Sequence, residues 1–211
     1  RPDAIAIIDG TDDRRITYAE LWRDACAFAS FLAGRGVRPG DGVSVQLPNA
    51  YETAVVDLGV LAVGAVLNPL LPNYRAHELR HILSVSHAKA YVTPDTYRGF
   101  DHRARAAELR AALPELHTRV VVGTPADPSS VSLADALTAA PLELVPRDAS
   151  TLSELIFTSG TEAAPKAIMH TEETINVNVR ATIDTMGLRD GDVVWMPSPV
   201  GHSTGLNFGL R

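Results

Sequence analysis

The chain alternates between short apolar runs that suit buried strands and longer segments in which apolar residues recur at helical spacing. The two patterns follow one another over residues 43–47, 50–63, 65–67, 76–85, 90–93, 101–113, 119–122 and 133–139. Such alternation is typical of a parallel sheet with helices on its faces. The sequence therefore predicts an α/β fold in which helices pack on a mainly parallel β-sheet.

A hairpin and a helix are predicted ahead of this region. An apolar run at residues 4–8 enters a polar turn, and residues 15–17 (Arg-Ile-Thr) follow it as the expected partner strand. Thr17 precedes Glu20 by three residues, the spacing of a helix-capping pair, and apolar residues then recur at helical intervals as far as Gly34. We expect a helix of several turns after Thr17.

Composition narrows the class of protein. Of the 211 residues, 45% are hydrophobic and 21% are charged, which is ordinary for a globular chain, and a net charge of -6 offers no basic field for nucleic acid. The longest apolar region, 55–71, is interrupted by Asp57, Asn68 and Pro69, so no membrane span is predicted. The single cysteine, Cys26, fits a helix core in a reducing compartment, and we expect a cytoplasmic protein.

One polar loop carries the strongest chemical signal. A short apolar run, Leu155–Phe157, leads into a segment of small hydroxylated residues around a glycine, and a lysine follows. Backbone amides in such a turn converge on anions, hydroxyls add donors, and a lysine can reach a phosphate. The candidate polyphosphate-binding residues are Thr158, Ser159, Gly160, Thr161 and Lys166.

The same residues also suit a plain turn between two strands, since Ala167–Met169 could begin a return strand. The spacing of Gly160 and Lys166 matches the Walker phosphate loop, but the chemistry does not. Pro165 replaces the second glycine, and Ala167 has no hydroxyl for a magnesium ion.

Residues 157–167, with His170 after them, closely resemble the phosphate-loop signature of the adenylate-forming enzymes, which include acyl-CoA synthetases, luciferases and the adenylation domains of peptide synthetases. The family pattern is aromatic-Thr-Ser-Gly-Thr-Thr-Gly-x-Pro-Lys-Gly. This chain departs from it at Glu162, Ala163 and Ala167. Losing two glycines narrows the freedom of the backbone, and a carboxylate at Glu162 would repel a triphosphate unless it turned to solvent or met a cation.

Weaker similarities to the same family extend along the chain in the order the family has them. They are residues 36–41, 47–49, 64–69, 78–79 and 86–89. Pro, Asp and Ser accumulate from Pro141 to Ser150, which indicates a boundary near Pro146. We expect an α/β N-terminal subdomain over residues 1–146, and over 147–211 the start of a second α/β subdomain that carries the phosphate loop.

A helix, a strand and a second polar loop are predicted after the phosphate loop. The helix begins near Thr171 and ends at Gly187, and Asp192–Met196 is expected to be a buried strand. The loop Pro197–Gly205 would then lie at the carboxyl end of that strand, where open α/β sheets bind ligands. Within it, His202 is either an ordinary loop histidine or a substrate-binding residue.

The resemblance implies a role for His202, because acyl-CoA synthetases commonly carry His at the floor of their carboxylate pocket. Amino-acid-activating relatives tend to carry Asp there, as the partner of an ammonium group. A carboxylic acid with a fatty or cyclic body is therefore expected as the small-molecule substrate.

The resemblance further implies a reaction. The acid attacks the α-phosphate of ATP to give an acyl-adenylate, and coenzyme A then takes the acyl group, with Mg²⁺ accompanying the nucleotide. Family members continue well past Arg211, so we expect an N-terminal piece that is inactive alone, and no catalytic residue or metal ligand is assigned. A non-catalytic relative that binds an acyl ligand or a partner remains an alternative, as does an unrelated nucleotide-binding module.

Three histidines, His77, His81 and His87, lie close together in the sequence, as the ligands of a metal site would. The first two would share one helix face, but no acidic or cysteine ligand stands at a matching offset. A solvated helix surface is the favoured interpretation.

Overall fold

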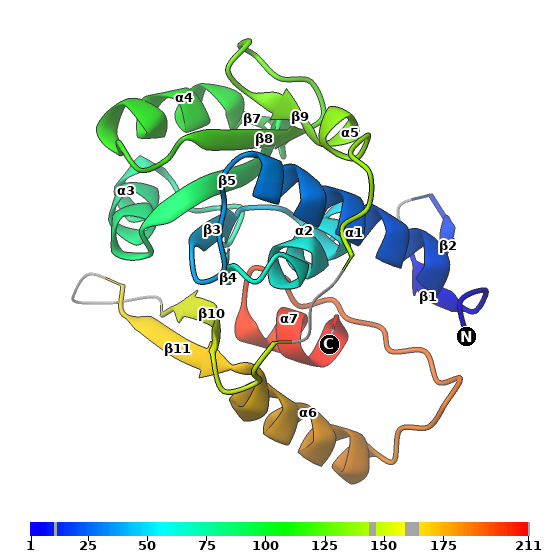
Figure 1. Ribbon diagram of the computed structural model, residues 1–211. Helices are drawn as coiled ribbons and strands as arrows, with labels where there is room; N and C mark the ends of the chain where they lie inside the picture. The colour runs from blue at the N-terminus through cyan, green and yellow to red at the C-terminus, as the bar shows by residue number, and fades with distance from the viewer. Residues whose placement is uncertain (11, 144–146, 159–164, 211) are drawn as a thin grey trace.

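A seven-stranded sheet forms the centre of the protein in a computed structural model, which describes residues 1–10, 12–143, 147–158 and 165–210 (Figure 1). Its strands lie in the order β11-β10-β4-β3-β5-β8-β9, and every neighbouring pair is parallel except β10 with β11. The strands are β3 (Gly42–Val45), β4 (Val66–Pro69), β5 (Ala88–Pro94), β8 (Thr118–Val122), β9 (Val131–Ser132), β10 (Leu152–Phe157) and β11 (Ala167–Thr171). The predicted α/β fold with a mainly parallel sheet is confirmed.

Helices cover both faces of this sheet. They are α1 (Tyr18–Gly34), α2 (Tyr51–Ala62), α3 (Ala76–Val85), α4 (Arg103–Ala112) and α5 (Leu133–Ala136). Successive residues of β5 point to opposite faces, as a strand requires. Ala90 and Val92 join the core under α1 and α2, whereas Tyr91 joins a separate core under α3 and α4.

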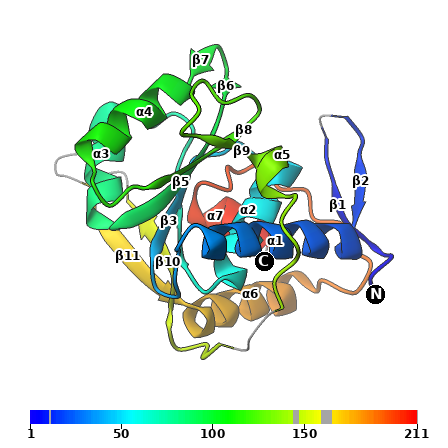
Figure 2. The ribbon, with the colours of Figure 1, turned by 45° about the horizontal axis from the view of Figure 1, so that its top comes forward.

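Two small antiparallel pairs lie outside the central sheet: β1 (Ile5–Ile8) with β2 (Arg15–Thr17), and β6 (Thr96–Tyr97) with β7 (Phe100–Asp101). The first pair stands at the start of α1, far from β11, in both views (Figures 1 and 2). Thr17 caps α1 as predicted, because its hydroxyl accepts from the N–H of Glu20 while the Glu20 carboxylate accepts from the N–H of Thr17.

The last part of the described chain contains α6 (Glu172–Met186) and α7 (Ser203–Gly209). As predicted, α6 starts after Thr171 and ends at Gly187, which takes the left-handed conformation with φ +65° that favours glycine. Of the fifteen residues in α6, Ile175 alone is classed as buried. The helix lies at the lower margin of the molecule in both views (Figures 1 and 2).

The prediction of a buried strand at Asp192–Met196 is wrong. This segment has no strand pairing among the described residues, and the side chains of Val193 and Trp195 are 78% and 83% exposed. A strand needs a neighbour for its backbone groups, and neither β11 nor β9, the two edges of the sheet, pairs with it. Apolar composition alone does not make a strand.

The subdomain boundary predicted near Pro146 lies outside the described residues and stays a prediction. Among the helices that the structure describes, none is both long enough and apolar enough to cross a membrane.

Candidate functional site

The polar loop predicted to bind phosphate is carried by the hairpin of β10 and β11. The antiparallel register pairs Phe157 with Ala167, and one further hydrogen bond continues the pairing, from the N–H of Thr158 to the carbonyl of Lys166 at 3.0 Å. The return strand that a plain turn would need is therefore present. The loop is closed by a paired stem, whichever ligand it binds.

This stem decides what Thr158 can offer a ligand. Its backbone N–H is already paired, and its hydroxyl donates a long hydrogen bond to the Lys166 carbonyl at 3.5 Å, a weak contact that it could exchange for a phosphate oxygen. Ser159, Gly160 and Thr161 lie outside the described residues, and their predicted role stays a prediction.

Lys166 stands at the end of the stem with its side chain exposed. The sequence contains two lysines, and the other, Lys89, is paired with Glu115 at 3.0 Å. A lysine ammonium is a compact charge on a flexible stem, which suits contact with a phosphate. Lys166 therefore has the chemistry that its predicted role requires, and Lys89 provides a natural comparison.

His81 holds the same end of the loop. Its half-buried ring contacts the carbonyl of Pro165 through Nε2 at 3.1 Å, across 84 residues of sequence. A carbonyl only accepts, so Nε2 carries the proton. The interpretation of His81 as part of a solvated helix surface is wrong, because α3 faces the hairpin at this point. Sequence spacing could not have found this contact, since it joins two separate elements.

His202 caps the short helix α7. The N–H of Thr204 donates to Nδ1 of His202 at 3.4 Å. An accepting Nδ1 places the proton of the neutral ring on Nε2. The ring therefore offers an N–H donor on the side away from the helix, and its side chain is exposed. Such a donor suits a carboxylate oxygen.

The loop stem and the His202 segment meet at the carboxyl ends of the strands β4 and β10. β4 runs parallel beside β10 with Leu67 opposite Glu154, so Leu70, just after β4, is level with Phe157, where the loop stem begins. Gly201 lies against Leu70 so closely that a Cβ on it would stand 2.4 Å from the Leu70 carbonyl oxygen. His202 follows directly. Both segments thus lie at the carboxyl ends of adjacent parallel strands, the usual ligand-binding edge of an open α/β sheet.

A second contact joins these elements deeper in the fold. Asn207 of α7 donates from Nδ2 to Oε1 of Glu154 in β10 at 3.3 Å, and both side chains are buried. The helix that His202 caps is therefore packed on the strand that leads into the loop stem.

The backbone after β4 is held by a buried polar pair. Gln46 donates from Nε2 to the carbonyls of Leu71 and Tyr74, at 3.0 Å each, and its Oε1 accepts from the hydroxyl of Tyr91. Burial raises the pKa of the Tyr91 hydroxyl, which keeps it a neutral donor. Gln46 was not singled out in the sequence, although a Gln within the apolar run 43–47 was a usable signal, because a buried amide needs partners.

No set of three or more His, Cys, Asp or Glu side chains that could hold a metal ion occurs among the residues the structure describes. The expected Mg²⁺ therefore has no ligands assigned in this chain, and its presence stays a prediction.

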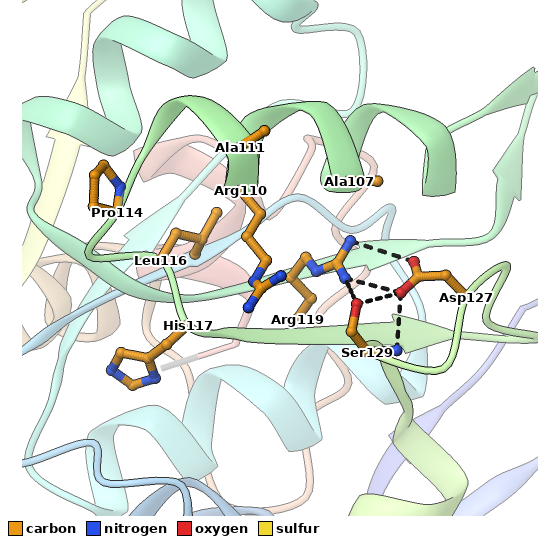
Figure 3. Close-up of a pocket in the computed structure, with 9 residues that line it drawn as sticks. All are labelled: Ala107, Arg110, Ala111, Pro114, Leu116, His117, Arg119, Asp127 and Ser129. Carbon is orange, nitrogen blue, oxygen red and sulfur yellow. Dashed lines mark hydrogen bonds and ion pairs between the residues drawn. The ribbon is translucent and has the colours of Figure 1, made fainter.

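A surface depression of about 390 Å³ lies elsewhere, between α4 and β8 (Figure 3). Its most buried charge, Arg119, donates to Asp127 at 2.9 Å and to the hydroxyl of Ser129. The Ser129 hydroxyl and the Arg119 guanidinium help to lower the pKa of Asp127 to about 2. None of the described site residues predicted from the sequence lines this depression.

Comparison with known sequences identifies relatives. The chain is 34% identical to the 2-hydroxy-7-methoxy-5-methyl-1-naphthoate--CoA ligase of Streptomyces carzinostaticus, with 95% of this chain and 38% of the relative covered. It is 34% identical to the medium-chain fatty-acid--CoA ligase of Escherichia coli (99% and 37% covered) and 35% identical to the salicyl-AMP ligase / salicyl-S-ArCP synthetase of Mycobacterium tuberculosis (96% and 36%). The chain thus spans well under half the length of these curated relatives.

Solved structures with the same fold also come from proteins similar in sequence to this chain. The apo structure of Mycobacterium smegmatis MbtA superposes with a TM-score of 0.89 at 38% identity, covering 99% of this chain and 38% of that one. Apo MatB from Rhodopseudomonas palustris gives 0.84 at 26% identity, covering 99% and 40%. The sequence also matches the family described as "AMP-binding enzyme" over residues 1–210. Because this match takes in nearly every residue, the chain belongs to the AMP-binding, adenylate-forming enzyme family.

Proposed function

We propose that this chain is the N-terminal part of an ATP-dependent acid–thiol ligase. The complete enzyme would join a carboxylic acid to the α-phosphate of ATP, releasing pyrophosphate, and would pass the acyl group from the adenylate to coenzyme A, releasing AMP. The observation that carries the proposal is the meeting of the loop stem and the His202 segment at the carboxyl edge of β4 and β10. Reactants bound to both segments would lie next to each other.

The protein's part in such a reaction is to align the reactants and offset negative charge. The Thr158 hydroxyl and the Lys166 ammonium would contact the outer phosphates, and Lys166 would stabilise the charge on the departing pyrophosphate. The Nε2–H of His202 would hold one oxygen of the acid, whose other oxygen attacks the α-phosphate.

The acid is proposed to lack an amino group that the protein must recognise. His202 offers a donor and not an anion, so it suits a carboxylate and not an ammonium group. The named relatives include ligases of a naphthoate, of medium-chain fatty acids and of salicylate, all of which are acids with an apolar or aromatic body. We propose a fatty or cyclic acid for this protein.

A longer polypeptide would also account for several exposed apolar side chains. The exposed fractions are 68% for Val177 and 67% for Met186 in α6, 70% for Met169 in β11, and 83% for Trp195. These side chains all belong to the region after the loop stem, in which few apolar side chains are buried. We propose that further chain of the complete ligase packs here, and that the 211-residue chain alone folds without forming adenylate.

The test is a titration of the 211-residue chain with ATP, with and without Mg²⁺, followed by the amide resonances of residues 158–166. Saturable shifts are expected. Lys166→Met should weaken binding by about tenfold, because it removes a charge-assisted contact. Lys89→Met removes the other lysine, which is paired with Glu115, and should leave binding unchanged.

Two results would count against the proposal. If no amide near the loop responds saturably, the chain contains a hairpin that only imitates a phosphate loop. If Lys89→Met weakens binding as much as Lys166→Met does, the response is a general charge effect. In the complete protein, nucleotide binding without thioester formation from any acid tested would favour the non-catalytic alternative, which rests on the departures at Glu162, Ala163 and Ala167.

A further inference from the structure

Asn49 makes three hydrogen bonds to a segment about 150 residues away in the sequence. Its Nδ2 donates to the carbonyl of Ser198 at 2.9 Å and to that of Met196 at 3.4 Å. Its Oδ1 accepts from the N–H of Val200 at 2.8 Å. The segment lies on the return from α6 to α7 (Figure 1).

This set of contacts requires an amide side chain. Two of the partners are acceptors and one is a donor, so the side chain must donate and accept in one plane. Asp could not donate, and Ser could not reach all three. The three contacts hold residues 196–200, at the end of the stretch Asp192–Met196 that has no strand neighbour among the described residues. Asn49 therefore supplies hydrogen bonds that an adjacent strand would otherwise supply.

The backbone that carries Asn49 is itself well anchored. It follows β3 and precedes α2, which begins at Tyr51. The hydroxyl of Thr53 donates to the carbonyl of Pro48, and the N–H of Tyr51 donates to the Asp9 carboxylate at 3.3 Å. Asn49 therefore projects from a fixed point of the central sheet.

The anchored segment leads straight to His202. Val200 is followed by Gly201, which lies against the carbonyl of Leu70, and the N–H of His202 donates to the carbonyl of Pro199 at 3.1 Å. Val200, Gly201 and His202 therefore each make a contact that restrains the backbone leading to the imidazole.

We propose that Asn49 is a positioning residue that sets the place of the His202 imidazole, and through it the place of the acid. Its role in positioning residues 196–202 is independent of any ligand, whereas its effect on the acid rests on the function proposed above.

The first test uses the 211-residue chain and hydrogen exchange at single amides. In Asn49→Ala the protection of the Val200 N–H should fall at least about fivefold, because its acceptor is lost, and that of His202 should fall with it. Asn49→Asp keeps the size of the side chain but sets a carboxylate against two carbonyl oxygens, so it should also speed exchange at His202. Asn178→Ala is the matched control, since this exposed amide in α6 donates to the nearby Thr174 carbonyl at 3.3 Å and, among the described residues, makes no contact with the segment before His202.

Thermal unfolding separates positioning from a general loss of stability. An acidic residue just before α2 favours the helix dipole and offsets part of the repulsion from the two carbonyl oxygens, so Asn49→Asp should unfold at an unchanged or only slightly lower temperature. Equal protection of Val200 and His202 in Asn49→Ala and in the unmodified chain would overturn the proposal. So would faster exchange throughout the sheet, because Asn49 would then support the fold and not the loop.

The second test uses the complete ligase. Asn49→Ala should raise the KM for the acid by about tenfold with the KM for ATP unchanged, since the loop stem is held separately by His81. Equal increases in both KM values would overturn the link to the acid. If the exchange result holds but no acid is activated by the unmodified protein, the proposed function fails while the positioning role of Asn49 stands.

Discussion

The buried imidazole of His102 should make the protein less stable as the pH falls below about 6.5. The side chain is 1% exposed, its ring meets Phe100 edge to face at 4.8 Å between ring centroids, and its Nε2 has no hydrogen-bond partner among the described residues. Burial, with a smaller effect from the positive charge of Arg75, lowers the pKa of His102 from 6.5 to about 4; the Asp101 carboxylate opposes this only in part.

The sign and the size of the effect follow from these two pKa values. The unfolded chain takes up a proton on this histidine near pH 6.5, whereas the folded chain does so only near pH 4. Between these values the unfolded state binds more protons, so the free energy of unfolding falls as the pH falls. The contribution of His102 amounts to a loss of about 2 kcal/mol at about pH 5, relative to neutral pH.

Urea unfolding at several pH values between about 7.5 and 5 measures this loss. His102→Leu should remove about 2 kcal/mol of the pH dependence, and His117→Leu, which changes an exposed histidine, should leave it as in the unmodified chain. The comparison uses the slope of the free energy of unfolding against pH, which is not affected by a pH-independent loss of stability from the substitution itself. If His102→Leu and the unmodified chain lose stability in parallel over this range, the imidazole is not held neutral by burial and the reasoning is wrong.

Two further substitutions test how the core is built. In Gly59→Ala the new Cβ would stand 2.8 Å from a backbone oxygen of α1. Urea unfolding should therefore show a net loss of stability of about 1 to 2 kcal/mol, even though alanine favours a helix more than glycine does. Gly34→Ala is the control, and it should lose no stability because the space around Gly34 is open. Asp127→Asn leaves the buried Arg119 guanidinium without its carboxylate and should lower the free energy of unfolding by about 3 kcal/mol. Asp101→Asn breaks the more exposed pair with Arg103 and should cost under about 1 kcal/mol by the same assay. An equal cost would contradict the importance of burial.

Much of the fold could be predicted because its signals are local. The capping pair at Thr17 and the left-handed Gly187 mark the boundaries of α1 and α6 within a few neighbouring residues, and both predictions are confirmed. The alternation of strands and helices required a mainly parallel sheet for the same reason, since each element buries one face against the next.

The candidate site was predictable only in part. The loop after Phe157 and the position of His202 stand out in the sequence because their residue types are unusual for a core and suited to phosphate and carboxylate. The residues that hold them could not be found in this way. His81 and Asn49 contact backbone groups of distant segments, and the family similarity of residues 47–49 does not show which distant segment Asn49 contacts.

Most of the helices, the longer strands and the residue types available for chemistry could be read from the sequence, because periodicity, caps and motifs are properties of short stretches. Tertiary packing determines which of the described backbone groups are paired and where the two segments meet. It paired the Thr158 amide, left Asp192–Met196 without a strand neighbour, and brought the loop stem and His202 to adjacent strand ends. The physical reason is that hydrogen-bond pairing depends on which distant segments become neighbours, and neighbours are chosen by the packing of the whole sheet.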